Sequence, residues 1–212
     1  MSGNFIIVIS GEEMTYSILV VDKERKIVGI GVASGSIAVG DRVPWIRSGV
    51  GVVATQGYTN VSLGRMGLKL LETGIEPQEV LRSLLKMDTG YEYRQLAIMD
   101  LYGRKAAFTG KNCPEWKGQY IGEDYVIAGN YLAGSQVIEA AREVMENREL
   151  DIPLRLIKAL IAGQEAGGDS RGNRSAIIIV ENNRSIVIRV DNDPNPTENL
   201  LEKYKTKFLK HL

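Results

Sequence analysis

Residues 15–33 read TYSILVVDKERKIVGIGVA, and the architecture follows from this stretch. Thr15 to Asp22 alternates and is rich in Ile, Leu and Val, and Ile27 to Ala33 has the same apolar character. The four residues between the two runs are all charged. Two β-rich runs joined by a short polar turn predict an antiparallel hairpin.

The same hairpin signal recurs twice along the chain. Further hairpins are expected at 93–99 with 105–109 and at 175–180 with 185–190, and single strands at 49–55 and 125–128. Residues 111–119 are expected to form a loop, and helical spacing covers 62–71, 76–87, 135–147, 152–166 and 196–209. Dominant hairpins and paired helices predict an α+β fold in layers, with mostly antiparallel sheets. No repeat or linker divides residues 14–212, which we expect to form a single domain.

Composition narrows the class of protein. The chain has 212 residues, with 26 Lys plus Arg and 26 Asp plus Glu, so its formal charge is zero. Nothing in this balance suggests attraction to nucleic acid or to an anionic membrane. One cysteine, Cys113, excludes an internal disulfide and fits a reducing cytoplasm. We expect a cytoplasmic protein that acts on a small molecule and pairs as a homodimer.

The scarcity of histidine limits the chemistry. The single histidine is His211, next to the last residue, and it is a poor candidate for a catalytic base or a zinc ligand. No metal and no organic cofactor are therefore expected. A threonine at a chain's N-terminus carries its own base, since an α-amine titrates near a pKa of ~7.7–8. Thr15 follows Met14, which could be a start residue.

The thirteen residues before Met14 have two possible explanations. MSGNFIIVISGEE contains a short apolar run, residues 5–9, without a basic flank. The run is too short to span a membrane and makes a poor signal peptide. It is either an additional edge strand or the result of a start assigned upstream of the true one.

Small polar residues end the second and third strands. Ser34, Ser36, Thr55 and Gln56 occupy these ends, where hydroxyls could relay a proton and Gln56 could donate to an oxyanion. Turn chemistry explains serine at such places equally well. If the strands neighbour the first one, we expect Thr15, Ser34, Thr55, Gln56 and Asp169 to line one pocket.

A glycine-rich loop, GGDSRGNRS at 167–175, links a helix to a strand. Asp169 could orient an amine, and Arg171 could hold a substrate carboxylate in a bidentate fork. An ordinary surface pair after a glycine-terminated helix is the alternative. Arg94, Gln95 and Asn130 are polar residues in strand-like runs, and Asn130 could instead be a structural cap.

Several runs resemble the DUF1028 family, proteins of unassigned function with an Ntn-hydrolase-like fold. They are MTYSI at 14–18, GVAS at 31–34, VPW at 43–45, GVVATQ at 51–56, RQL at 94–96, AFTG at 107–110, GNYLAG at 129–134 and AGGDSRG at 166–172. The resemblance implies a four-layer αββα sandwich in which the nucleophile opens the first strand. That position corresponds to Thr15, although family members usually begin at the equivalent Met-Thr.

Two functions remain open on this reasoning. The first is a cofactor-free hydrolase of a small amide, with Thr15, Ser34 and Asp169 as catalytic residues. Its substrate would be bound by Ser36, Thr55, Gln56, Arg94, Asn130 and Arg171. The second is a non-catalytic Ntn-like protein that binds a small ligand or serves as a structural subunit. A free Thr15 amine favours the first, and an intact N-terminal extension favours the second.

Overall fold

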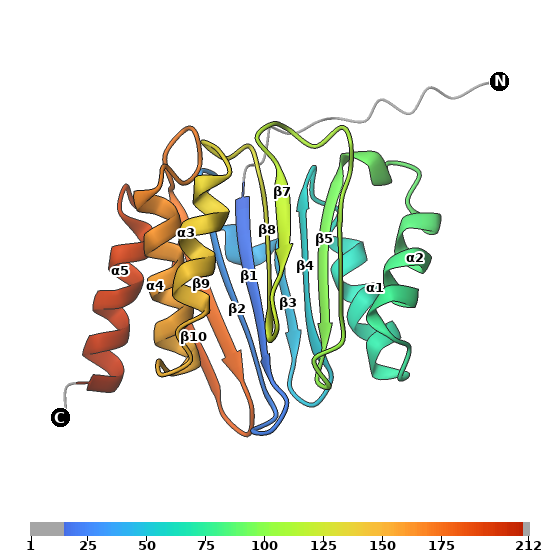
Figure 1. Ribbon diagram of the computed structural model, residues 1–212, viewed down its shortest axis with the longest axis horizontal. Helices are drawn as coiled ribbons and strands as arrows, with labels where there is room; N and C mark the ends of the chain where they lie inside the picture. Colours follow the sequence, from blue (N-terminus) through green and yellow to red (C-terminus); the bar gives the residue numbers. More distant parts are fainter. Residues whose placement is uncertain (1–14, 210–212) are drawn as a thin grey trace.

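The computed structural model describes residues 15–209, which form two antiparallel sheets packed face to face (Figure 1). The larger sheet has the strand order β10-β9-β2-β1-β8-β7, and the smaller has the order β3-β4-β5-β6. The strands of the larger sheet are β1 (Thr15–Asp22), β2 (Ile27–Ser34), β7 (Gly118–Ile121), β8 (Tyr125–Asn130), β9 (Ser175–Glu181) and β10 (Ser185–Val190). Those of the smaller are β3 (Pro44–Arg47), β4 (Gly51–Gly57), β5 (Arg94–Asp100) and β6 (Lys105–Thr109).

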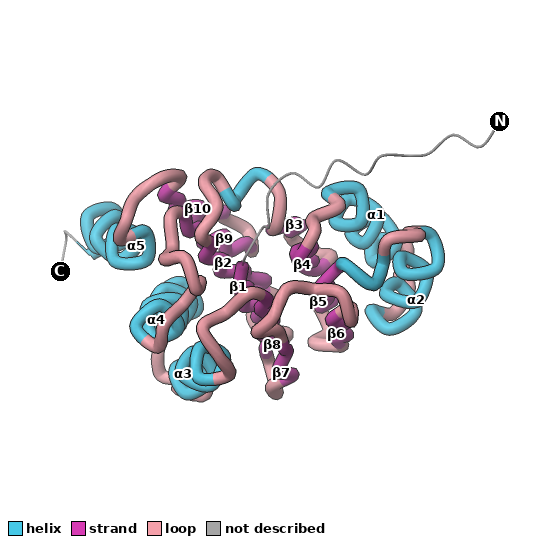
Figure 2. Tube along the Cα trace, turned by 90° about the horizontal axis from the view of Figure 1, so that it is seen from above, coloured by secondary structure: helices cyan, strands magenta, loops and turns pink. Residues whose placement is uncertain are grey.

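Helices cover both outer faces of the sandwich (Figure 2). The larger sheet is covered by α3 (Gln136–Met145), α4 (Ile152–Glu165) and α5 (Pro196–Tyr204), and the smaller by α1 (Val61–Glu72) and α2 (Pro77–Met87). Short helical turns lie at Val39–Asp41, Tyr91–Tyr93 and Lys205–Leu209. The four-layer αββα sandwich expected from the sequence is confirmed.

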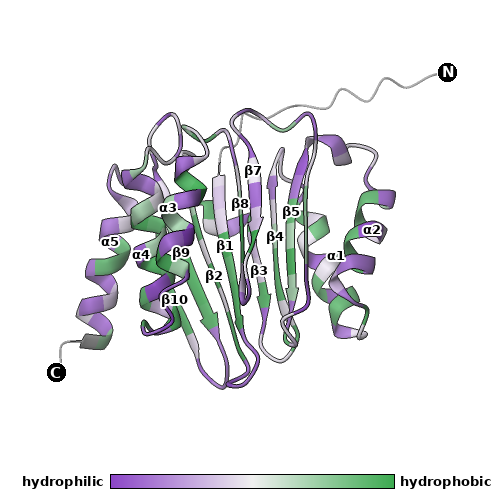
Figure 3. Cartoon of the chain, viewed as in Figure 1, coloured by the Kyte–Doolittle hydropathy of each residue, from purple (hydrophilic) through white to green (hydrophobic). Residues whose placement is uncertain are grey.

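The alternation of β1 sorts its side chains between two cores. Tyr16, Ile18 and Val20 pack against the helices of the larger sheet. Leu19 and Val21 instead pack against the smaller sheet. Successive strand residues point to opposite faces, so every second residue from Thr15 onward faces the space between the sheets. Figure 3 shows the apolar residues gathered on the strands and on the sheet-facing sides of the helices.

Glycine allows α4 to lie close to β2. A Cβ at Gly31 would sit 3.2 Å from the Leu160 side chain and 3.5 Å from that of Leu156. Contacts at these distances leave little room for any side chain at this position. The GIG pattern of β2 therefore serves helix packing.

Two strands are absent from the sequence-based prediction. β3 is short, begins with a proline and lies at a sheet edge, a position that proline tolerates. β7 falls partly within the expected 111–119 loop and is an edge strand with two exposed residues. Neither has the apolar alternation that marks a strand. Elsewhere β4 and β8 run two residues further than expected, and α5 ends at Tyr204 with a wider turn beyond it.

The expected N-terminal extension, residues 1–13, and His211 lie outside the described residues. Within 15–209, no helix is both long and apolar enough to cross a membrane.

Candidate functional site

Strand register brings four small polar residues into one row at the end of the larger sheet. Thr15 pairs with Ser34 on β2 and with Asn130 on β8, and Ser34 pairs in turn with Ser175 on β9. Directly opposed residues of antiparallel strands point to the same face. That face is the one turned to the smaller sheet, because Leu19 shares it. All four row residues are buried, and Thr15 is 2% exposed.

Hydroxyl groups are linked along this row. Thr15 Oγ1 donates to Ser34 Oγ at 3.1 Å, and Ser34 Oγ also accepts the Ser36 amide at 3.1 Å. Ser175 Oγ donates to the Ser36 carbonyl at 2.6 Å and accepts the Val39 amide. The serines therefore hold the chain leaving β2, and Ser34 presents an oxygen to Thr15.

The smaller sheet contributes a second polar row, which faces the first. Gln56, Gln95 and Thr109 are paired across β4, β5 and β6. Gln56 Nε2 donates to the Thr15 carbonyl at 3.3 Å and to the Ala128 carbonyl at 3.0 Å. Gln56 is therefore bonded to the backbone of the larger sheet, where it holds the start of β1.

Asp169 lies beyond the start of β1, between the ends of its two neighbours. Asp169 forms an isolated bridge with Leu132, which follows β8, and its carboxylate accepts the Gly35 amide at 2.5 Å. The same carboxylate accepts the Arg171 amide at 2.9 Å, and its side chain is fully buried. A Cβ at Gly35 would stand 2.2 Å from Asp169 Oδ2, so glycine permits this approach.

Arg171 is an exposed cation at this end. Its side chain is 42% exposed, its Nε lies 3.4 Å from Asp169 Oδ1, and its guanidinium stands 5.8 Å from the Tyr131 ring centre. Tyr131 directly follows Asn130 and has a φ of 58°, a backbone region that non-glycine residues seldom adopt. Tyr131 and Arg171 together form part of the rim beside the Thr15 row.

Thr55, expected in the pocket, and Arg94, expected to bind the substrate, lie elsewhere. Thr55 points to the opposite face of β4 from Gln56, and its Oγ1 donates to the Asn60 carbonyl before α1. The prediction that Thr55 lines a pocket with Thr15 is wrong, because adjacent strand residues face opposite sides. Arg94 shares the outer face, where its Nε donates to Asp88 at 2.7 Å and its Nη1 to the Tyr58 carbonyl. Both residues have structural partners on the helix side.

Two further ionisable groups near this end, the Tyr16 phenol and the Cys113 thiol, are held neutral by burial. Burial raises the pKa of the Tyr16 phenol, whose hydroxyl donates to the Leu160 carbonyl at 2.6 Å. Burial also raises the pKa of the Cys113 thiol to about 11. A thiol with that pKa is a poor nucleophile at neutral pH. Among the residues described, no group of three or more His, Cys, Asp or Glu could hold a metal ion.

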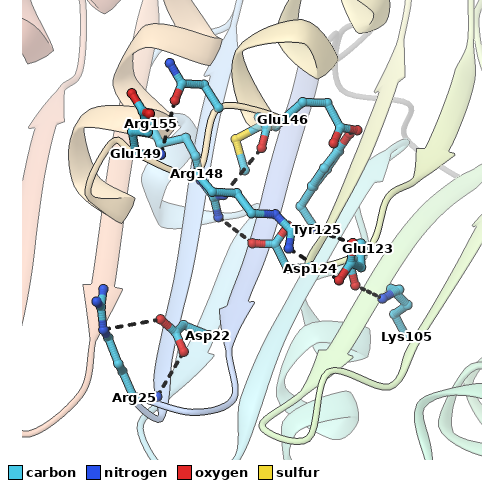
Figure 4. A network of polar contacts seen from close by, with 12 residues as sticks. Asp22, Arg25, Lys105, Glu123, Asp124, Tyr125, Glu146, Arg148, Glu149 and Arg155 are labelled. Carbon is cyan, nitrogen blue, oxygen red and sulfur yellow. Dashed lines mark hydrogen bonds and ion pairs between the residues drawn. The ribbon is translucent and has the colours of Figure 1, made fainter.

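The opposite end of the sandwich carries a charged network instead (Figure 4). Arg155 Nη2 lies 2.7 Å from Asp124 Oδ2, and Arg148 Nη2 lies 2.7 Å from Glu123 Oε2. A hollow of about 760 Å³ opens there, at the β1–β2 and β9–β10 turns. Its charged lining balances: Lys23, Arg25, Arg148, Arg155 and Arg184 against Asp22, Glu24, Glu123, Asp124 and Asp151. This balance favours internal ion pairing over attraction of a charged ligand.

A model described as a family of unknown function, DUF1028, matches residues 15–200. The chain belongs to the DUF1028 family. A crystal structure of a Silicibacter pomeroyi protein, described with the same family model, is 34% identical, with a TM-score of 0.86 over 91% of this chain and 85% of that one. No curated protein matches in sequence.

Other solved structures similar to this DUF1028 chain are more distant. HslV from Trypanosoma brucei is 14% identical, with a TM-score of 0.49 over 78% of this chain and 98% of that one. BPH from Thiobacillus denitrificans, solved with epoxomicin, is 13% identical, with a TM-score of 0.41 over 85% of this chain and all of the other.

Sequence reasoning named Gln95 only as a polar residue in a strand-like run, and it gave no role to Ser17 or Ser175, which also belong to this DUF1028 site. Each lies on a strand at a position that faces the space between the sheets. A buried polar residue at an inward position of an otherwise apolar strand is the signal that could have revealed them.

Proposed function

We propose that this protein is an Ntn-type hydrolase of a small amide, with Thr15 as nucleophile and the Thr15 α-amine as base. The observation that carries the proposal is the place of Thr15. It is the first residue of the central strand, and its Oγ1 lies 3.1 Å from Ser34 Oγ in a row of small polar groups. The family match also begins at this residue.

The chemistry follows once Thr15 has a free amine. Thr15 Oγ1 attacks the amide carbonyl as its proton passes to the α-amine, directly or through Ser34. The amine then gives that proton to the departing nitrogen as the carbon–nitrogen bond breaks. The acyl-Thr15 ester is hydrolysed by water, which restores the hydroxyl. No cofactor takes part in these steps.

Neighbouring groups support distinct steps. Asp169, with its buried carboxylate beyond the start of β1, is proposed to orient the amine. Arg171, half-exposed at the rim, is proposed to bind a substrate carboxylate, and Ser36 and Asn130 to contact the substrate beside it. Gln56 is proposed to hold the Thr15 carbonyl, because its amide already donates there. Thr55 and Arg94 have no part in the mechanism.

The decisive experiment varies how the chain begins. A protein that starts at Met14 and is processed to Thr15 should hydrolyse small amides, whereas an intact 212-residue chain should not, because an acylated amine has no basicity. Intact mass must be recorded in the same assay, since the full-length chain could cut itself after Met14. A panel of small amides, with and without a free carboxylate, serves as substrate.

Variants assign the activity to Thr15. Thr15→Ala should abolish hydrolysis and Thr15→Ser should retain part of it, because serine keeps the hydroxyl. Thr55→Val is the matched control, since it removes a buried threonine hydroxyl on the far face of β4. Equal activity from an intact full-length chain and its Thr15→Ala variant would overturn the proposal and favour a non-catalytic ligand-binding protein.

A further inference from the structure

Two buried glutamines join the sheets next to Thr15. Gln56 and Gln95 lie side by side on β4 and β5, with exposed fractions of 1% and 0%. Gln56 Nε2 donates to Gln95 Oε1 at 2.7 Å, and Ser17 Oγ on β1 donates to Gln56 Oε1. Buried amides of this kind stabilise a structure only when their polar atoms have partners.

The orientation of the Gln95 amide follows from its partners. Gln95 Nε2 lies 3.0 Å from the Gly118 carbonyl and 2.9 Å from the Gly129 carbonyl. Backbone carbonyls only accept hydrogen bonds, so the atom that faces them must be the nitrogen. Gln95 Oε1 is then the atom that faces Gln56 and Asn130.

The orientation of the Gln95 amide determines that of the Asn130 amide. Gln95 Oε1 is an acceptor, so the Asn130 atom 3.0 Å away must be Nδ2, and Asn130 Oδ1 is turned away from Gln95. Gln56 is fixed by the same reasoning, because its Nε2 faces the carbonyls of Thr15 and Ala128. Backbone carbonyls of β1, β8 and the start of β7 therefore determine which way all three amides point.

We propose that Gln95 is a positioning residue, which locks the Asn130 amide so that Oδ1 is held as a hydrogen-bond acceptor beside Thr15. Asn130 is the direct partner of Thr15 in the sheet and points to the same face. In the proposed hydrolase, Oδ1 accepts an N–H from the Thr15 amine or from the bound amide. That role rests on the proposed function, whereas the locked orientation does not.

The lock favours one class of substrate. An acceptor beside the nucleophile suits a substrate that offers an N–H, such as a primary or secondary amide. An ester of the same shape offers no hydrogen at that point. In the active protein, Asn130→Leu should therefore narrow the preference for an amide over its matched ester by about tenfold.

The first test needs no substrate. In Asn130→Asp, only the protonated carboxyl can donate to Gln95 Oε1 while keeping an acceptor on the other side. Its folded pKa should therefore lie above the unfolded value of ~3.9. This contribution to stability should be fully present below the unfolded pKa of ~3.9, largely present at pH 4, and lost as the pH rises through the folded pKa. Relative to wild type, the Tm should fall by about 10 °C more at pH 8 than at pH 4.

The charged groups around residue 130 are the same in wild type and in Asn130→Asp. Their titration therefore cancels when the Tm of the variant is compared with that of wild type at each pH. They are the Thr15 α-amine on β1 when it is free, Lys117 with Glu115 before β7, and Asp169 with Arg171 before β9. The facing strands β4 and β5 supply the neutral amides of Gln56 and Gln95, and the Arg94–Asp88 pair lies on the far face. Gln119→Glu, an exposed carboxylate at the outer end of the same network, is the control and should show no such difference.

The second test measures the reactivity of Thr15. A small β-lactone is added to protein that starts at Thr15, and acylation is followed by intact mass. Gln95→Leu should slow acylation at least tenfold, whereas Thr55→Val should not. A pH-independent deficit in Asn130→Asp would overturn the lock. If the lock holds but wild-type Thr15 is never acylated, the proposed hydrolase and the role of Asn130 toward it both fall.

Discussion

The two ends of the sandwich are both polar, but they are built from different chemistry. At the Thr15 end, neutral amides and hydroxyls lie fully buried between the sheets and bond to one another and to backbone carbonyls. At the Asp22 end, guanidinium and carboxylate groups pair across turns around a hollow (Figure 4). Most of these ion pairs stand partly in water, where solvent screens them.

This difference shows at which end of the sandwich the polar side chains are held in one orientation. A buried neutral network keeps each amide in one orientation, because every misplaced donor or acceptor costs free energy. Exposed ion pairs tolerate many geometries and contribute little each. The Thr15 end is therefore the better candidate for chemistry, although the hollow of about 760 Å³ lies at the other end.

The largest effect is expected at Gln95. Gln95→Leu removes the hydrogen bonds that Gln95 makes to the carbonyls of Gly118 and Gly129 and to the amides of Gln56 and Asn130. The loss should be about 3–5 kcal/mol, measured as the free energy of unfolding in urea. Gln119→Ala should change it by less than about 0.5 kcal/mol, because that residue is exposed. A similar loss of unfolding free energy in Gln95→Leu and Gln119→Ala would mean that the buried network stabilises the fold no more than an exposed residue does.

An intermediate effect on the free energy of unfolding is expected at the buried ion pair of the charged end, Arg155 with Asp124. Asp124→Asn leaves the Arg155 guanidinium, only 4% exposed, without its carboxylate, and should cost about 2–3 kcal/mol. Pairing Asp124→Asn with Arg155→Met should recover part of this loss, since no unpaired charge remains. The same urea measurement checks both. Additive losses would contradict a coupled pair.

The smallest effect is expected at the exposed rim of the charged end. The Arg25 side chain is 78% exposed, and its Nε lies 3.8 Å from Asp22 Oδ2. Arg25→Ala should therefore change the free energy of unfolding by less than about 0.5 kcal/mol, even at low salt. A loss above 1 kcal/mol there would narrow the contrast between the two ends.

Part of the site could be found from local pattern alone. The alternation from Thr15 to Asp22 predicted the strand, and the hairpin to β2 placed Ser34 beside Thr15. Asp169 was singled out by its glycine-rich loop, and the structure places it beyond the start of β1. Thr55 lies at the expected strand end, but it points to the opposite face of β4 from Gln56, because adjacent strand residues alternate between faces.

Periodicity, turn residues and the lack of a usable histidine were enough to predict the elements, the layered class and the candidate nucleophile, because each can be read without knowing which segments pair. Tertiary structure alone decided that β8 lies beside β1, so that Asn130 meets Thr15. It also decided that β4 and β5 face that pair, so that Gln56 and Gln95 bond across the interior. Contacts between residues so far apart in the chain depend on sheet order and register, which the burial of the whole core selects.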